Sequence, residues 1–233
     1  MIESTKGITL HYYKYSENSV ISKIFTERFG IQSYLIKGIR SKNSKIKLNL
    51  LQPLTLVQLE VSNKKNNNLQ FIKEIKNSLP LGEIMQNMNK RFVTLFMSEV
   101  LLKILTEKEE DKNLFNYIWE TVINMNSDKK LNSNFPINFL LNLSKSLGFY
   151  PSHENISYKY FNLESGEFSN SEEYYCIGGD LKDDFTKLIL QENPDFHYKR
   201  RMEILEVLIS YFNLHHYNLK NLKSHEIIGS LRR

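Results

Sequence analysis

A loop-like stretch from residue 37 to residue 47 gives the strongest local chemical signal in the chain. Five cations fall within these eleven residues with no acid between them: Lys37, Arg40, Lys42, Lys45 and Lys47. Cations spaced along a loop can follow a phosphate backbone, and each neutralised phosphate releases counterions, so binding is strong, salt-dependent and largely indifferent to sequence. The loop also holds Gly38, which allows a close backbone approach, and serines that can donate to phosphate oxygens. The stretch therefore predicts polyanion binding.

Aromatic side chains on the neighbouring predicted strands suggest a second kind of contact. They are Tyr12, Tyr13, Phe25 and Tyr34. Proteins that bind single-stranded nucleic acid stack bases on such rings. Each ring can also fill a barrel core, and for any one of them the core is the commoner place. We include Tyr34 in the predicted DNA-binding set.

Two further groups of cations lie near the end of the chain, Lys199-Arg200-Arg201 and Arg232-Arg233. Either group extends a nucleic-acid track, or it complements helix C-termini and the acidic middle of the chain. The sequence does not separate these alternatives. Arg200 and Arg201 are candidate DNA-binding residues.

Charge is distributed unevenly along the chain. Residues 1–80 contain 13 Lys or Arg and 5 Glu, a net charge of +8. Residues 81–195 contain 11 Lys or Arg and 18 Asp or Glu, a net charge of −7, and residues 196–233 carry +4 from 7 cations and 3 acids. This division predicts separate surfaces, the first of them suited to a polyanion. The alternative is a lysine-rich surface that serves only solubility.

Motifs for catalysis are absent from the sequence. There is no nucleophile elbow, phosphate loop, dinucleotide fingerprint, two-histidine metalloprotease helix or calcium loop. The acidic groups at residues 109–111 and 180–184 could serve a metal-dependent nuclease. Each group sits at a predicted helix start, where acids are favoured by capping and by the helix dipole. We expect no enzyme activity and no cofactor.

Metal binding is also poorly supported. Cys176 is the only cysteine, so no internal disulfide and no multi-cysteine zinc site can form within one chain. The pair His215-His216 and the run Asp195-Phe196-His197 lack further ligand partners at a recognisable spacing. We expect these histidines to be structural and no metal to be bound.

The first 79 residues read as a β domain. Five runs rich in β-branched and aromatic residues are separated by turn signals, at residues 8–13, 20–26, 31–37, 54–61 and 69–75. Five strands in this length fit a small oligonucleotide-binding (OB-fold) Greek-key barrel, although an SH3-like barrel would show much the same pattern.

Residues 80–233 read as an α-helical domain with one short non-helical insertion near residues 150–180. Apolar spacings of three and four predict helices over 92–105, 114–123, 139–147, 181–189, 202–212 and 219–231. Gly148 followed by Pro151 marks the end of the third. The predicted fold class is therefore α+β, a five-stranded barrel followed by helices.

No apolar run approaches the roughly 20 residues that cross a bilayer. The first residues have neither the apolar stretch of a secretory signal nor the character of a transit peptide. These observations predict a cytoplasmic protein with no membrane partner.

The chain resembles the RecO family of bacterial recombination mediators nearly end to end. The most specific part is Lys37-Gly38-Ile39-Arg40-Ser41-Lys42 after Phe25-Thr26-Glu27 at this distance. Supporting segments are Thr5-Lys6-Gly7-Ile8, Gln52-Pro53, Leu147-Gly148-Phe149-Tyr150-Pro151 and Leu222-Lys223-Ser224. Many members of the family hold a four-cysteine zinc module after the Leu-Gly-Phe-x-Pro segment, and only Cys176 remains here.

The resemblance implies binding to single- and double-stranded DNA and annealing of complementary strands. It also implies two partners, RecR and single-stranded DNA-binding protein, so that RecA can be loaded. The alternative is a protein-interaction scaffold whose basic barrel docks an acidic partner.

The C-terminal tail of single-stranded DNA-binding protein is acidic and ends in an apolar residue with a free carboxylate, so it needs an apolar groove with a cation at its lip. In the family the groove lies in the helical domain, and here Lys145 beside Leu141 and Phe149 is the candidate. Lys145 is alternatively a solvated helix lysine.

Overall fold

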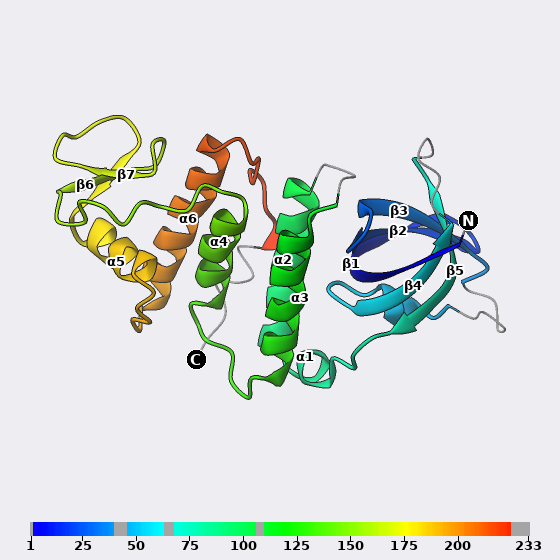
Figure 1. The fold of residues 1–233 in the computed structure, drawn as a ribbon. Helices are drawn as coiled ribbons and strands as arrows, with labels where there is room; N and C mark the ends of the chain where they lie inside the picture. Colours follow the sequence, from blue (N-terminus) through cyan, green and yellow to red (C-terminus); the bar gives the residue numbers. More distant parts are fainter. Residues whose placement is uncertain (1, 40–45, 63–67, 106–109, 225–233) are drawn as a thin grey trace. The chain divides into compact units, whose positions relative to one another are not determined.

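The computed structural model describes residues 2–39, 46–62, 68–105 and 110–224 (Figure 1). The chain divides into two compact units, Met1–Lys129 and Lys130–Arg233, and each is described by itself. No helix in the described ranges is both long and apolar enough to cross a membrane. Strands give way to helices between Asn77 and Gly82. A division into domains at residues 79 and 80 stays a prediction, because the first compact unit includes helices as well as the barrel.

Five strands form a closed barrel in the first unit (Figure 1). They are β1 (Glu3–Ser16), β2 (Ser19–Thr26), β3 (Gly30–Lys37), β4 (Leu56–Ser62) and β5 (Gln70–Asn77). Their order is β1-β2-β3-β5-β4, and β4 returns to pair with β1. The β3–β5 pair is parallel and the other pairs are antiparallel. This order confirms the predicted OB-fold barrel.

Strand β1 closes the barrel because it serves two partners. Residues 3–8 pair with β4, and residues 7–16 pair with β2. A register shift between Thr9 and His11 inserts Leu10 as an extra residue, and such a bulge bends a strand. Gly7 lies where both pairings overlap, and a Cβ atom there would fall 2.8 Å from Ile24 Cγ2 and 2.9 Å from Leu59 Cδ1. The close approach at Gly7 therefore excludes a larger side chain.

The barrel interior is filled by mostly aliphatic side chains from β2, β3, β4 and β5 and from the segment after β3, and Tyr12 of β1 packs against them. That segment contains a short 3-10 helix, η1 (Leu48–Leu51). The buried set is Val20, Ile24, Tyr34, Ile36, Ile39, Leu51, Val57, Leu59, Val61 and Ile75. Full burial of one such side chain contributes roughly 1.5–3 kcal/mol.

Helices α1 (Gly82–Gln86), α2 (Met88–Ile104) and α3 (Lys112–Ser127) complete the first unit. Helix α2 begins where the Asn87 side chain accepts the Lys90 N–H at 3.2 Å. In the same way, Asp111 begins α3 by accepting the Leu114 N–H at 2.9 Å. The ring of Phe25 on β2 contacts that of Phe115 on α3, with centroids 5.5 Å apart. These helices therefore cover one part of the barrel's outside and leave another part open.

The second unit contains three helices and a small sheet. The helices are α4 (Phe135–Ser146), α5 (Gly179–Ile189) and α6 (Tyr198–Leu214). The sheet has the order β7-β6-β8, with β6 (Tyr160–Asn162), β7 (Glu167–Ser169) and β8 (Cys176–Gly178). The region predicted as a short non-helical insertion thus contains a three-stranded sheet.

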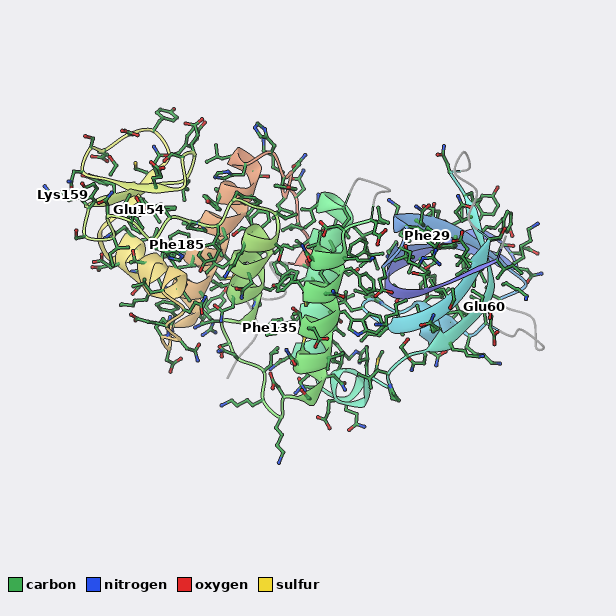
Figure 2. The ribbon with its side chains drawn as sticks, viewed as in Figure 1. Phe29, Glu60, Phe135, Glu154, Lys159 and Phe185 are labelled. Carbon is green, nitrogen blue, oxygen red and sulfur yellow. The ribbon has the colours of Figure 1, made fainter. Side chains whose placement is uncertain are left out.

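Aromatic rings hold the sheet to the helices. Phe161 contacts Phe168 at 5.0 Å and Phe185 on α5 at 5.2 Å between centroids, and Figure 2 marks Phe185 beside the sheet. The hydroxyl of Tyr211 on α6 donates to the Phe149 carbonyl at 2.6 Å. This core contains no cysteine, so aromatic packing is what stabilises the sheet among the described residues.

The ends of two predicted helices can be compared with the sequence. Helix α4 ends as predicted at Gly148, whose φ is +86°, and the N–H groups of Gly148 and Phe149 return to the carbonyls of Lys145 and Ser144. The helix predicted from residue 219 was placed too early, because residues 219–223 are not helical. Its remainder from residue 225 lies outside the described residues.

Candidate nucleic-acid interface

A row of four side chains crosses the open outer face of the barrel. Tyr13 pairs with Ile21, Ile21 with Leu35, and Leu35 with Phe71, from β1 through β2 and β3 to β5. Paired residues on neighbouring strands point to the same side of a sheet. The two inner members are 6% and 9% exposed, whereas Tyr13 is 44% and Phe71 46% exposed. An apolar floor is therefore flanked by two accessible rings, three strand spacings or about 14 Å apart. We call these four residues the outer row.

Cations lie in the pairings on both sides of the outer row. One neighbouring line contains His11, Lys23 and Ser33, and the other contains Ser19 with Lys37. Lys37 is exposed and Lys23 is half-buried. Neither lysine forms an ion pair with a described residue. Their charge is therefore available to an anionic ligand.

The acids of the barrel are mostly engaged on another side. Four of the five pair with local cations: Glu3 with Arg28, Glu27 with Lys6, Glu60 with Lys73, and Glu74 with Lys76. Figure 2 marks Glu60 on β4. Glu17 is exposed in the β1–β2 turn. The face around the outer row is thus the less acidic part of the barrel surface.

The two ends of the basic stretch, residues 37–47, are held against the barrel beside this face. Ile39 is 5% exposed, and its N–H donates to the Asn18 carbonyl at 3.1 Å. On the return, Ile46 and Leu48 pack against the barrel core. Lys47 between them is exposed. The predicted contacts Arg40, Lys42 and Lys45 lie outside the described residues and stay predictions.

The structure corrects the prediction for Tyr34. Its side chain is fully buried in the barrel core, where burial raises the pKa of the phenol well above its usual value. Phe25 is also buried, against α3, and Tyr12 packs on the core. Of the four proposed aromatics, Tyr13 is the one on the outer row. Strand alternation separates Tyr13 from Tyr12, but the bulge at Leu10 decides which of them points outward, and Phe71 was not singled out at all.

The two arginines of α6 have partners within the second unit. Arg200 pairs with Asp184 at 3.2 Å and with Glu203 at 2.8 Å. Arg201 donates from Nη1 to the Phe196 carbonyl at 2.6 Å. These contacts favour the second reading of this patch, in which its cations complement the acidic segment and local carbonyls. Neither arginine is brought to the outer row by a described contact, and their role in DNA binding stays a prediction.

The predicted groove around Lys145 is corrected as well. Lys145 is exposed on α4, but Leu141 is only 2% exposed. Phe149 is packed among the rings of Tyr211, Phe212, His215 and Tyr217. The apolar side chains beside Lys145 are therefore already occupied by the core.

An apolar hollow with a cation lies at the other end of α4. It is lined by Ser133, Pro136, Ile137, Tyr198, Arg201, Met202 and Leu205, from the first turns of α4 and α6. Figure 2 marks Phe135, where α4 begins. Arg201 is half-buried at this hollow, where its Nη1 donates to the Phe196 carbonyl. The sequence shows the cations of Lys199-Arg200-Arg201, but it does not show that they lie beside α4.

The groups considered for metal chemistry have structural roles. Asp111 caps α3, and Asp184 pairs with Lys187 and Arg200. His197 begins α6 by accepting the Lys199 N–H at 3.4 Å. No group of three or more His, Cys, Asp or Glu residues in the described ranges is placed to hold a metal ion.

A closed five-stranded barrel followed by helices defines the class of OB-fold proteins with a helical second part. Comparison with known families refines this. The family models described as "Recombination protein O N terminal" and "Recombination protein O C terminal" match residues 1–78 and 85–192. The chain therefore belongs to the RecO family of DNA repair proteins.

Curated relatives agree over nearly the whole length. The DNA repair protein RecO of Azobacteroides pseudotrichonymphae is 33% identical, over 99% of each chain. That of Flavobacterium psychrophilum is 30% identical over 96% of each, and that of Bacteroides fragilis 28% identical over 99% of each. The similarity thus covers both the barrel and the helices.

Proposed function

We propose that the chain binds single- and double-stranded DNA on the open face of its barrel and anneals complementary strands. The observation that carries this proposal is the outer row, in which two half-exposed rings flank a buried apolar floor beside cations that form no ion pair with a described residue. Bases of a single strand stack on Tyr13 and Phe71, and each such contact is worth about 1–3 kcal/mol. Lys23 and Lys37 neutralise phosphates, together with the basic stretch.

Annealing follows from the same charges. Two single strands repel each other through their phosphates, and a basic surface that neutralises one strand lowers this repulsion as the second approaches. Nothing in this step breaks or forms a covalent bond, so the protein acts without catalysis. Incubation with labelled DNA plus Mg²⁺ or Mn²⁺ is expected to leave the strands intact, and cleavage that tracks the purified chain would contradict this.

The partners follow from family membership as proposals. The chain works with RecR and with single-stranded DNA-binding protein, in the cytoplasm and on the nucleoid, and indirectly promotes RecA loading. For the acidic tail of single-stranded DNA-binding protein, we place the terminal apolar residue in the hollow between α4 and α6. The accessible apolar side chains there are Tyr198, which is 46% exposed, and half-buried Met202, whereas Pro136, Ile137 and Leu205 are buried. Arg201 supplies the cation for the carboxylates.

The test of DNA binding is anisotropy of labelled single strands across a salt series. The double variant Tyr13→Ser/Phe71→Ser removes both rings at exposed positions and is expected to bind at least about 30-fold more weakly, because two stacking contacts are lost. Tyr198→Ser is the matched control, since Tyr198 is 46% exposed but lies on α6. Wild-type affinity in the double variant would remove the outer row from the interface.

The scaffold alternative makes a different prediction. A barrel that docks an acidic protein segment should bind a labelled glutamate-rich peptide at least as tightly as an oligonucleotide of equal charge. We expect the oligonucleotide to bind more tightly, because a carboxylate peptide has no bases to stack on Tyr13 and Phe71.

A further inference from the structure

The small sheet of the second unit carries an acidic and aromatic surface that DNA binding does not use. Residues 160–181 contain five acids and no Lys, Arg or His. In the turn between β7 and β8, Tyr174 is 83% and Tyr175 47% exposed. Among the large hydrophobic side chains of the described residues, Tyr174 is the most exposed. The two rings contact each other, with centroids 5.0 Å apart, and contiguous exposed apolar surface is typical of interaction sites.

The two faces of this sheet have different roles. Phe161, Phe168 and Ile177 are paired across the three strands, and the first two are buried in the aromatic core. Tyr160 and Asn162 alternate to the other face and hold acids there. The Tyr160 hydroxyl donates to Glu172 at 3.4 Å, and Asn162 Nδ2 donates to Glu173 at 2.7 Å. The acids are therefore fixed on the side that faces away from the core.

The turn fixes the two tyrosines. The Leu163 N–H donates to the Tyr175 carbonyl at 3.1 Å, and the Cys176 N–H donates to the Glu173 carbonyl at 3.3 Å. Tyr175 has a φ of +64°, in the left-handed region. The rings of Tyr174 and Tyr175 are nearly perpendicular, at 87°, with centroids 5.0 Å apart. A surface that is already ordered loses little conformational entropy when a partner binds.

The negative charge of this surface determines which class of partner can bind to it. A run of carboxylates repels phosphates, so this surface is unsuited to nucleic acid. The faces of aromatic rings attract ammonium and guanidinium groups. Two lysines flank the segment: Lys182 is engaged with the Ile156 carbonyl at 2.6 Å, and exposed Lys159 lies at the outer edge of this unit in Figure 2. The five acids thus keep a net negative charge.

We propose that Tyr174 and Tyr175, with Glu172 and Glu173, form a docking surface for a Lys- or Arg-rich segment of a protein partner. The cationic groups lie over the two rings and pair with the carboxylates. This surface is independent of the barrel face and of the hollow between α4 and α6.

The probe is a fluorescein-labelled peptide of alternating Arg and Gly, titrated with the full chain, beside a peptide of alternating Glu and Gly. The variant Tyr174→Ser/Tyr175→Asn removes both rings, and Asn suits the left-handed backbone at position 175. We expect the Arg peptide to bind about fivefold or more weakly to this variant, as loss of two cation–π contacts implies. Glu172→Gln is expected to reduce the salt dependence of binding.

The matched control is Tyr15→Ser/Tyr198→Ser, which removes two tyrosines that are 61% and 46% exposed elsewhere. Equal affinity of the Arg peptide for the wild type, the turn variant and the control would overturn the proposal. So would loss of self-association in the turn variant with peptide binding unchanged, because the occupant would then be a second copy of the chain. Unchanged oligonucleotide binding by the turn variant separates this result from any failure of the barrel proposal.

Discussion

The outer row of the barrel and the β7–β8 turn both expose a pair of aromatic rings, yet their surroundings have opposite charge. Tyr13 and Phe71 stand among lysines without ion-pair partners in the described chain, whereas Tyr174 and Tyr175 stand in a segment with five acids and no cation. An exposed ring can bind either a base or a cation. The comparison teaches that neighbouring charge, more than the ring itself, assigns the ligand.

The largest effect is expected when the charge of the basic stretch is removed. The triple variant Arg40→Ala/Lys42→Ala/Lys45→Ala should bind single-stranded DNA about 100-fold more weakly at 0.1 M salt, and the slope of log affinity against log salt should fall by about 2. Both follow from roughly 0.7 counterion released per phosphate contact. Anisotropy titrations at several salt concentrations measure them.

A matched triple variant is available on the same barrel. Lys6, Lys73 and Lys76 already pair with acids, so changing all three to Ala should alter DNA affinity far less. If both triple variants lose the same affinity, the total charge of the barrel accounts for DNA binding. The local charge around each pair of rings would then not decide which ligand it binds.

A smaller effect is expected for binding of the acidic tail. Arg201→Glu should weaken binding of a labelled acidic peptide with a free apolar C-terminus about tenfold, because charge reversal within a contact costs more than about 1 kcal/mol. Lys145→Glu should leave the affinity unchanged. The reverse result in isothermal titration would return the site to Lys145.

A modest stabilisation is expected for Tyr34→Phe. The Tyr34 hydroxyl is buried without a hydrogen-bond partner among the described residues, and an unsatisfied buried hydroxyl costs about 1–3 kcal/mol. Its removal should raise the free energy of unfolding by about 1 kcal/mol in urea titrations. DNA affinity should not change, and a loss of affinity in the folded variant would make Tyr34 a contact after all.

The smallest effect is expected for the pH dependence of stability, through His215 in the core of the second unit. Burial lowers the pKa of His215 below its ordinary value of 6.5, since its ring stacks on Phe149 and its Nε2 has no described hydrogen-bond partner. The unfolded chain therefore takes up this proton first as pH falls below 6.5, and stability present above 6.5 is lost toward the lower folded pKa. Thermal melts of His215→Phe should depend less on pH below 6.5 than those of the wild type.

Secondary structure could be predicted from the sequence where a single hydrophobic pattern dominates a segment. The five strands and helices α2 to α6 were predicted because β-branched runs and three- or four-residue spacings are local signals, whereas the short α1 was not predicted. The β6–β8 sheet was harder, since its strands are three residues long and their pairing joins residues up to about 18 apart, which the sequence does not display.

The site was predicted less completely than the fold. Cations could be placed on a loop from composition alone, but the direction of a strand side chain depends on register. Tyr34 and Tyr13 look alike in the sequence, and pairing puts one inside the barrel and the other outside. Likewise, the hollow at Arg201 requires α4 to lie beside α6, which only tertiary packing establishes.

The extra residue at Leu10 has a consequence for how this surface changes in evolution. Before it, Thr9 faces inward beside Ile24, and after it His11 and Tyr13 face outward. If the same residues ran through without a bulge, strict alternation from Thr9 would turn Tyr12 outward and Tyr13 into the core, whereas deletion of Leu10 would join Thr9 to His11 in regular register and leave Tyr13 facing outward. The bulge therefore absorbs one residue of chain length without changing which side chains of the strand's second half reach the ligand, so the loss of this one codon would preserve the outer row.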